Sequence, residues 1–328
     1  MAFLYIVVAL VLIFDFLNGF HDSANSIAIV VSTKVLSPLV AVMLAAFFNF
    51  IAFTVFPLRV AHTIGNGVVN PDVLNMTVIA SALVAAITWN LATWWLGLPS
   101  SSSHTLVGGL IGAAVTHGGT STVIFAGVIK IVSFIFIAPI LGMAMSFIIS
   151  TFVVFLFRKF TPTNVDKVFR KLQIISSSTL SLGHGGNDAQ KSMGIIWAAL
   201  IVSGLTTKND DIALWIILSC QSAIALGTLF GGWRIVKTMG QRITKVKPFE
   251  GFCAETAGAL TLFGATHFGI PVSTTHTITG AIIGVGARKG ASAVKWGVTK
   301  KIFWAWILTI PVSAAIGSVM YHFFNLIF

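Results

Sequence analysis

Residues 97–105 read Gly-Leu-Pro-Ser-Ser-Ser-Ser-His-Thr, and residues 269–277 read Gly-Ile-Pro-Val-Ser-Thr-Thr-His-Thr. The second stretch follows the first at an offset of 172 residues. The same offset relates three further pairs of residues: Gly108 and Gly280, Gly112 and Gly284, and Pro139 and Pro311. The chain therefore contains two copies of one unit.

A second duplicated motif lies nearer the start of each copy. Gly19-Phe20-His21-Asp22 is matched 166 residues later by Gly185-Gly186-Asn187-Asp188, and Ser26 is matched by Ser192. Two separate motifs repeated in the same order are not expected by chance. We predict three segments: a first repeat at residues 1–157, a linker at 158–172 and a second repeat at 173–328.

The composition indicates a protein built for lipid. Hydrophobic residues make up 56% of the chain and charged residues 9%, and the mean hydropathy is +0.95. A soluble domain carries roughly 25% charged residues, so this chain lacks the polar surface that water requires. Its apolar stretches have the length of membrane-spanning helices. We predict an all-α integral membrane protein, and we expect no binding of nucleic acid because no basic stripe lies on a soluble face.

The distribution of basic residues indicates how the two repeats are oriented. Residues 59–75 hold one Arg and one Asp, whereas the matching loop at 234–247 holds five Lys and Arg. Because Lys and Arg are enriched in cytoplasmic loops, matching loops are expected on opposite sides of the membrane. This predicts inverted-topology repeats in the cell (plasma or inner) membrane, with both termini outside and the 158–172 loop cytoplasmic.

An ionisable group inside a membrane span is costly and usually marks function, and two acidic residues are the clearest cases. They are Asp22 and Asp188, at equivalent points of the two copies. Nearby glycines predict broken helices, with spans 2–17 and 23–34 in one copy and 173–187 and 189–205 in the other. Oxygen ligands suit a small hard cation, so we predict sodium sites from Asn18, Asp22, Ser23, Asn25, Asn187 and Asp188. The alternative is that these groups only bond neighbouring helices.

The Ser/Thr-rich motifs after Pro99 and Pro271 have the composition of an anion site. Each could open a half-helix, whose N-terminus offers free N–H groups and a positive dipole end. Two such tips facing each other would surround a tetrahedral anion with hydroxyl groups. The predicted phosphate-binding residues are Ser101, Ser102, Ser103, Thr105, Ser273, Thr274, Thr275 and Thr277. The alternative is that these residues only cap helices.

Four further residues are candidates for coupling or gating: His104, His276, Lys191 and Glu255. The spacing of Ser101 and His104 raises the question of a hydrolase, but no nucleophile elbow or third orienting acid accompanies the pair. We therefore expect no enzyme. Lys191 is a counter-charge to Asp188, a phosphate contact or a snorkelling side chain. Glu255 is a relay or gate, or it forms an ion pair with the nearby basic loop.

At these motifs the chain resembles the inorganic phosphate transporter (PiT) family of secondary carriers. The resemblance rests on residues 19–25, 183–191 and 271–276, and also on the stretch Gly-Trp-Arg-Ile-Val-Lys-Thr-Met-Gly at 232–240. It implies a helical carrier with inverted repeats, phosphate as substrate, coupling to sodium or protons, and a homodimer. Asp22, Asn25, Asn187 and Asp188 match the functional acids and amides of the family.

We therefore predict sodium-coupled import of inorganic phosphate by alternating access, with no cofactor beyond the co-transported sodium. The alternatives are a proton-coupled carrier of phosphate or metal-phosphate, a sulfate carrier and, from another class, an anion channel. All-oxygen clusters favour sodium, whereas His21 and His184 leave protons open.

Overall fold

The computed structural model describes residues 2–70 and 73–327, and within these ranges the chain contains no β-strand. Asp72, the acid counted in the weakly charged loop, lies outside them. The first half contains α1 (Ala2–Ser32), α2 (Pro38–Ile51), α3 (Arg59–Gly67), α4 (Met76–Leu96), α5 (Ser102–Gly118) and α6 (Phe125–Phe157). The second half contains α7 (Pro162–Val202), α8 (Leu214–Phe230), α9 (Trp233–Lys237), α10 (Pro248–His267), α11 (Thr274–Lys289) and α12 (Trp296–Ile327).

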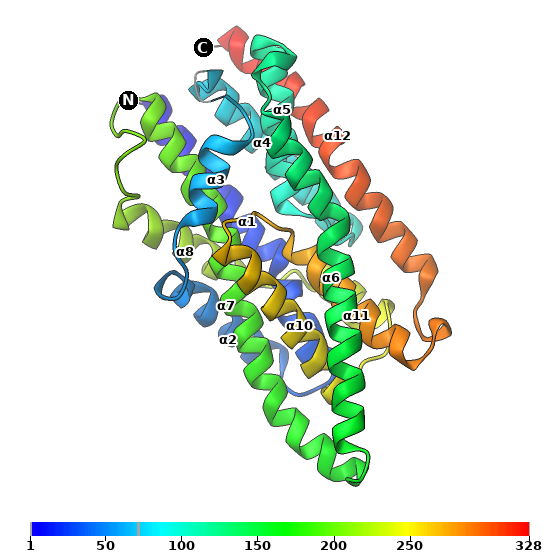
Figure 1. Cartoon of the computed structure of the whole chain (residues 1–328). Helices are drawn as coiled ribbons and strands as arrows, with labels where there is room; N and C mark the ends of the chain where they lie inside the picture. Colours follow the sequence, from blue (N-terminus) through cyan, green and yellow to red (C-terminus); the bar gives the residue numbers. More distant parts are fainter. Residues whose placement is uncertain (1, 71–72, 328) are drawn as a thin grey trace.

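Equivalent helices of the two halves run in opposite directions. Both termini lie at one end of the molecule, and α6 leads away from that end to the turn before α7 (Figure 1). Its counterpart α12 returns to the end that holds the termini (Figure 1). The predicted all-α architecture with inverted repeats is confirmed.

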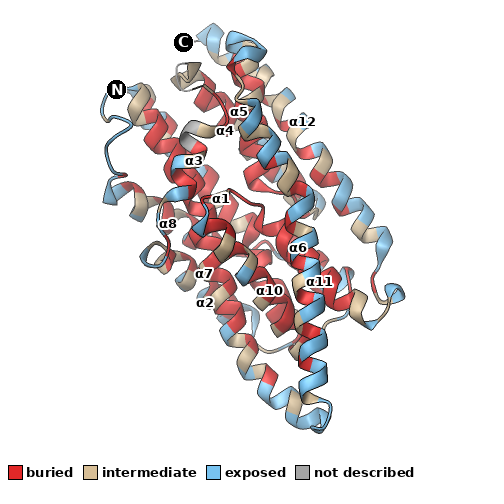
Figure 2. Ribbon diagram, viewed as in Figure 1, coloured by how far each residue is buried: buried red, intermediate tan, exposed pale blue. Residues whose placement is uncertain are grey.

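Several helices have the length and apolar character of a membrane span. Within the described residues, four do so as single helices, namely α1, α4, α6 and α12. A fifth span results if α8 is joined with the segment Trp233–Arg242, which follows it across a bend of 60°. The outer helices α6 and α12 expose large apolar side chains such as Phe136, Ile148 and Val319. Figure 2 shows exposed residues concentrated on these helices and buried residues at the centre. This inversion of the soluble pattern is expected for a surface that faces lipid.

The helices around Asp22 and Asp188 are continuous, so the expected breaks at the glycines there are wrong. Residues 2–32 form one helix, and residues 162–202 form another. The second helix also includes most of the expected linker, because it starts at Pro162, capped by Thr161. Gly19 and Gly185 allow close packing instead. A Cβ at Gly19 would lie 2.1 Å from the carbonyl oxygen of Ile224 in α8, and one at Gly185 would lie 2.4 Å from that of Asn49 in α2.

The true interruptions lie at the Ser/Thr-rich motifs. Gly97 and Gly269 both have a φ of 65°, which favours glycine. Gly97 caps the end of α4, Gly269 lies just beyond the end of α10, and each is followed two residues later by a proline. The next helices, α5 and α11, have 17 and 16 residues. At 1.5 Å per residue each is about 25 Å long, shorter than a hydrocarbon core of roughly 30 Å. They start near the middle of the molecule and run toward opposite ends (Figure 1).

Each of these short helices packs against the last long helix of the other repeat. A Cβ at Gly108 would lie 2.1 Å from Oγ of Ser313 in α12, and one at Gly112 would lie 1.9 Å from the carbonyl oxygen of Ala314. The equivalent Gly280 and Gly284 make the same approach to α6, at Pro139 and Ser146. Small residues four apart let membrane helices pack backbone to backbone. The two repeats are therefore interlocked.

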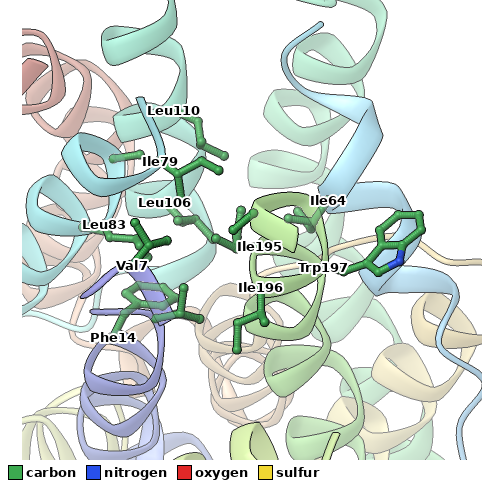
Figure 3. Packing of buried hydrophobic residues seen from close by; sticks show 14 of the residues in the cluster. Val7, Phe14, Ile64, Ile79, Leu83, Leu106, Leu110, Ile195, Ile196 and Trp197 are labelled. Carbon is green, nitrogen blue, oxygen red and sulfur yellow. The ribbon is translucent and has the colours of Figure 1, made fainter. Parts of the chain in front are cut away.

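An apolar cluster supports the central helices on the side of the termini. Figure 3 shows Val7 and Phe14 of α1 beside Leu83 of α4, and Leu106 of α5 near Ile195 of α7. All five are buried. Three of these helices carry the polar motifs, so the cluster fixes the positions of the motifs relative to one another.

We predict that Gly112→Ala destabilises the protein, while Gly264→Ala does not. The new methyl group at residue 112 meets the backbone of α12, and relieving that overlap costs about 1–3 kcal/mol. At Gly264, also inside a helix, an added Cβ meets nothing within 4 Å. Thermal unfolding of both variants in detergent measures the difference. Equal melting temperatures would contradict the close packing of α5 on α12.

Candidate functional site

Asp22 lies in the middle of α1 with 2% of its surface exposed. Its Oδ1 lies 2.7 Å from Nδ1 of His21 and accepts a hydrogen bond from the Thr275 hydroxyl at 3.3 Å. Its Oδ2 accepts one from the Ser102 hydroxyl, also at 3.3 Å. Ser102 belongs to the first repeat and Thr275 to the second. The tips of both half-helices therefore meet at a single carboxylate.

Asp188 occupies the equivalent place in α7 and is held by different partners. Its Oδ1 forms a buried ion pair with Nζ of Lys191 at 2.5 Å. Its Oδ2 lies 3.3 Å from Nε2 of His184 and accepts a hydrogen bond from the Thr274 hydroxyl at 3.2 Å. Lys191 also donates to the Ser103 hydroxyl and, at 3.0 Å, to the carbonyl oxygen of Val272. This lysine is buried and does not snorkel to the membrane surface.

The two acids belong to one site rather than two separate sites. One ligand atom each from Asp22, His184 and Asp188 lie within 4.8 Å of one another. Asn25, one turn beyond Asp22, donates to the hydroxyls of Thr274 at 3.0 Å and Thr275 at 2.9 Å. Carboxylates, amides and hydroxyls from both repeats thus surround one small region, which is suited to binding a cation.

Half of the predicted hydroxyl groups take part in this cluster. Ser102, Ser103, Thr274 and Thr275 do so, as described above. The Ser101 and Ser273 hydroxyls cap their helices, accepting from the backbone N–H groups of His104 and His276 at 3.3 and 3.2 Å. Thr105 and Thr277 donate to backbone carbonyls of their own tips, those of Ser102 and Ser273. For Ser101, Ser273 and Thr277 the capping or local alternative describes the observed contacts, while Thr105 also donates to Oδ1 of Asn90 in α4 at 3.2 Å.

The predicted cation ligands differ in whether their side-chain oxygens are free to bind an ion. Ser23 points away from the acids, because its hydroxyl donates to the Phe20 carbonyl and accepts from the Gly232 N–H at 2.6 Å. Asn187 donates to the Thr266 hydroxyl at 2.9 Å and the Ile270 carbonyl at 3.2 Å, and so braces the approach to the second tip. The side-chain oxygens of Asn18, Asn25 and Asn187 are buried with no hydrogen-bond partner in the described chain. These three oxygens remain available as ligands.

His104 and His276 face each other where the two short helices begin. Their ring centroids lie 4.8 Å apart, and His276 stacks on Trp306 at 3.9 Å. Neither ring is hydrogen-bonded to the neighbouring serine, whose hydroxyl is used by the backbone. The arrangement therefore has none of the geometry of a Ser–His nucleophile.

Glu255 lies apart from the site, buried between α10 and α7. Its carboxylate accepts from the Ser176 hydroxyl at 2.6 Å and from Nε2 of Gln173 at 3.1 Å. The expected pairing with the basic loop is instead made by Glu250, which contacts Lys289 at 3.0 Å and Arg288 at 3.6 Å. Glu255 thus carries no counter-charge among the described residues.

Comparisons with known proteins find the same family along nearly the whole chain. Residues 18–164 match the phosphate transporter family, and residues 157–317 match it a second time. The chain belongs to this family. A "probable low-affinity inorganic phosphate transporter" of Rhizobium meliloti is 53% identical over 320 residues, covering 98% of this chain and 96% of the relative. One of the same description from Bacillus subtilis is 44% identical, covering 98% and 97%.

The fold has a solved counterpart. A structure titled "The sodium-dependent phosphate transporter" superimposes with a TM-score of 0.89 at 28% identity and covers 100% of both chains. The family and these relatives are transporters, so the expectation of a non-enzymatic, multi-pass membrane protein is confirmed.

Asp15 is the polar residue of this transporter that the sequence reasoning undervalued. It lies in α1 two turns before Asp22, fully buried, and neither carboxylate oxygen has a hydrogen-bond partner among the described residues. Asn18 and Ser192 lie beside it. The signal was an acid inside an apolar stretch, the same criterion that identified Asp22. Thr93 was missed, although it contacts His21 at 3.2 Å and His21 lies 2.7 Å from Asp22.

Proposed function

We propose that this protein imports inorganic phosphate by symport with sodium, and that the two Ser/Thr tips hold the phosphate. The observation that carries the proposal is the position of Asp22, whose carboxylate receives hydroxyl hydrogen bonds from both tips. A group at this position acts on both halves of an anion site at once. Membership of the phosphate transporter family supports the choice of substrate.

Electrostatics supplies the reason for coupling. A phosphate that entered between the tips would meet Asp22 at close range, in a region that excludes water. Two unit charges of like sign 4 Å apart repel each other by about 4 kcal/mol at an effective dielectric constant of about 20. A cation bound to Asp22 removes that repulsion and frees the Ser102 and Thr275 hydroxyls to donate to the anion. The cation and the phosphate therefore bind better together than alone.

The donors suit a carried anion. Four hydroxyls, from Ser102, Ser103, Thr274 and Thr275, lie at the N-terminal ends of α5 and α11, where the helix dipoles favour negative charge. No arginine belongs to the described cluster, so the anion is not held by a bidentate ion pair. Such binding is weak enough to allow release on the other side of the membrane.

The inverted repeats provide a way for the site to open to either side of the membrane. The site lies where the two halves meet, a plan shared by many secondary transporters. In the proposed cycle, the repeats rock about the site so that it opens outward and then inward. The continuous helices α1 and α7 carry the acids, while α5 and α11 carry the tips.

Proton coupling is the second candidate, because one contact favours it. Nδ1 of His21 lies 2.7 Å from Oδ1 of Asp22, a geometry in which a proton can neutralise the acid. Sodium remains the first choice because the solved counterpart is titled sodium-dependent. Sulfate has a charge and shape similar to those of phosphate, and the uptake assay includes it.

Uptake into proteoliposomes tests the proposal. We expect labelled phosphate to accumulate above its external concentration when a sodium gradient is imposed, and less so with sulfate or with a proton gradient. Asp22→Asn is expected to abolish accumulation while the protein elutes as a folded species, because the variant has no charge for the cation to neutralise. Accumulation by Asp22→Asn at the wild-type rate would refute the role of this acid. Uptake that only dissipates a phosphate gradient would identify an anion channel.

The assignment of the tips predicts different effects of the same substitution at two neighbouring threonines. Thr275→Val removes a hydroxyl from the cluster, whereas Thr277→Val removes one that bonds its own helix at Ser273. A hydrogen bond to a charged group contributes roughly 1.5–3 kcal/mol, so Thr275→Val should weaken apparent phosphate affinity about tenfold or more. Thr277→Val should leave it within about twofold. The half-saturating phosphate concentrations decide, and equal values would contradict the assignment.

We propose that both termini lie outside the cell and that the turn before α7 is cytoplasmic. The basic loops around Arg234, Lys245 and Arg288 support this orientation. Single cysteines test it, because native Cys220 and Cys253 are buried and can be replaced. We expect a membrane-impermeant maleimide to label Asn325→Cys in intact cells and to label Thr163→Cys only after the membrane is opened. The reverse labelling pattern would show that the topology is inverted.

The homodimer implied by the family resemblance stays a prediction.

A further inference from the structure

The two halves of the site differ at one pair of equivalent residues. The offset of 166 that relates Asp22 to Asp188 also relates Asn25 to Lys191, so each acid is followed three residues later by a different donor. Both donors reach the Ser/Thr tip of the opposite repeat. Asn25 of the first repeat bonds Thr274 and Thr275, and Lys191 of the second bonds Ser103. The geometry is conserved between the halves, but a positive charge is present in only one.

The contacts of the Lys191 ammonium are those of a bound cation. Its three N–H groups have three acceptors: Oδ1 of Asp188, the Ser103 hydroxyl and the carbonyl oxygen of Val272. A carboxylate, a hydroxyl and a carbonyl are also the oxygen types that bind a small hard cation. The side chain is 2% exposed. An ammonium group with three donors is thereby fully satisfied.

No equivalent charge serves Asp22. Its side-chain partners are His21 and the hydroxyls of Ser102 and Thr275, and no Lys or Arg in the described part of the chain forms an ion pair with it. Lys191 offsets the charge of Asp188, and no lysine or arginine in that part of the chain offsets that of Asp22. The site is therefore asymmetric in charge although it is nearly symmetric in shape.

We propose that the Lys191 ammonium occupies the second of two equivalent cation positions as a built-in, non-exchanging cation. This inference rests on the proposed function, and it assigns the mobile coupling ion to the Asp22 half alone. Each transported phosphate is then accompanied by one mobile cation fewer than a site with Asn at both positions would require. Lys191 also holds Ser103 and residue 272 together, which keeps the two tips in register when the mobile cation is absent.

The test is Lys191→Asn, which gives both halves the same donor. We expect this variant to acquire a second sodium site, so that the Hill coefficient for sodium in phosphate uptake rises from about one toward about two. We also expect the reversal potential in proteoliposomes to report one more positive charge per phosphate. Lys191→Met, which offers no oxygen ligand, should lose uptake at every sodium concentration. Lys130→Asn, at an exposed position on α6, is the matched control and should behave as wild type.

An unchanged Hill coefficient and an unchanged charge per phosphate in an active Lys191→Asn variant would overturn the proposal. If the variant does not transport, sodium-dependent thermal stabilisation in detergent decides. A larger rise in melting temperature with sodium for Lys191→Asn than for wild type supports a vacated cation position, and an equal rise overturns it. Failure of the proposed function is a separate outcome, because it would show as wild-type protein that accumulates no phosphate under any gradient.

Discussion

The neighbouring carboxylates of Asp22 and Asp188, in the interior of a membrane protein, are the constraint on which the rest of this structure depends. Water is not available there, so each charge must be satisfied by protein groups. Hydroxyl groups on the tips of α5 and α11 bond to Asp22 and Asp188. These tips lie near the middle of the molecule because α5 and α11 are too short to span the membrane. The glycines that let each short helix pack on a long helix of the other repeat follow from this requirement. The fold thus brings polar groups of the protein to charges that water cannot reach.

Under the proposed function, the same hydrogen bonds connect the site to transport. A Ser or Thr hydroxyl that donates its proton to Asp22 cannot donate it to an anion, so the carboxylate and the phosphate compete for the same donors. A cation shifts that competition by weakening the hold of the acid. In the proposed mechanism, coupling therefore needs no long pathway, because the cation and the anion would bind to adjoining atoms of Asp22, Ser102 and Thr275.

Sequence reasoning predicted the fold class and the meeting of the two acids, because composition and a duplicated motif are properties of the chain alone. It was wrong about the breaks at Gly19 and Gly185. The sequence does not distinguish a glycine that allows a neighbouring helix to pack closely from a glycine that ends its own helix. It also grouped Thr277 with Thr275, because the sequence does not show the side-chain direction that separates a hydroxyl bonded to its own helix from one that reaches Asp22. Asp15 was passed over because no duplicated partner drew attention to it: its equivalent in the second repeat is Ser181.

Duplication would explain the proposed alternating movement, but strict symmetry would not serve the proposed coupling equally well. Two equivalent halves of similar packing allow outward and inward arrangements of comparable energy, as rocking requires. If both halves also bound their ions identically, each acid would need its own mobile cation before the anion could enter. In this chain Asp188 is paired with the Lys191 ammonium, whereas the partner of Asp22 is the His21 imidazole. Divergence at a few polar positions can thus set the number of coupling ions while the interlocked backbone retains the symmetry of the movement.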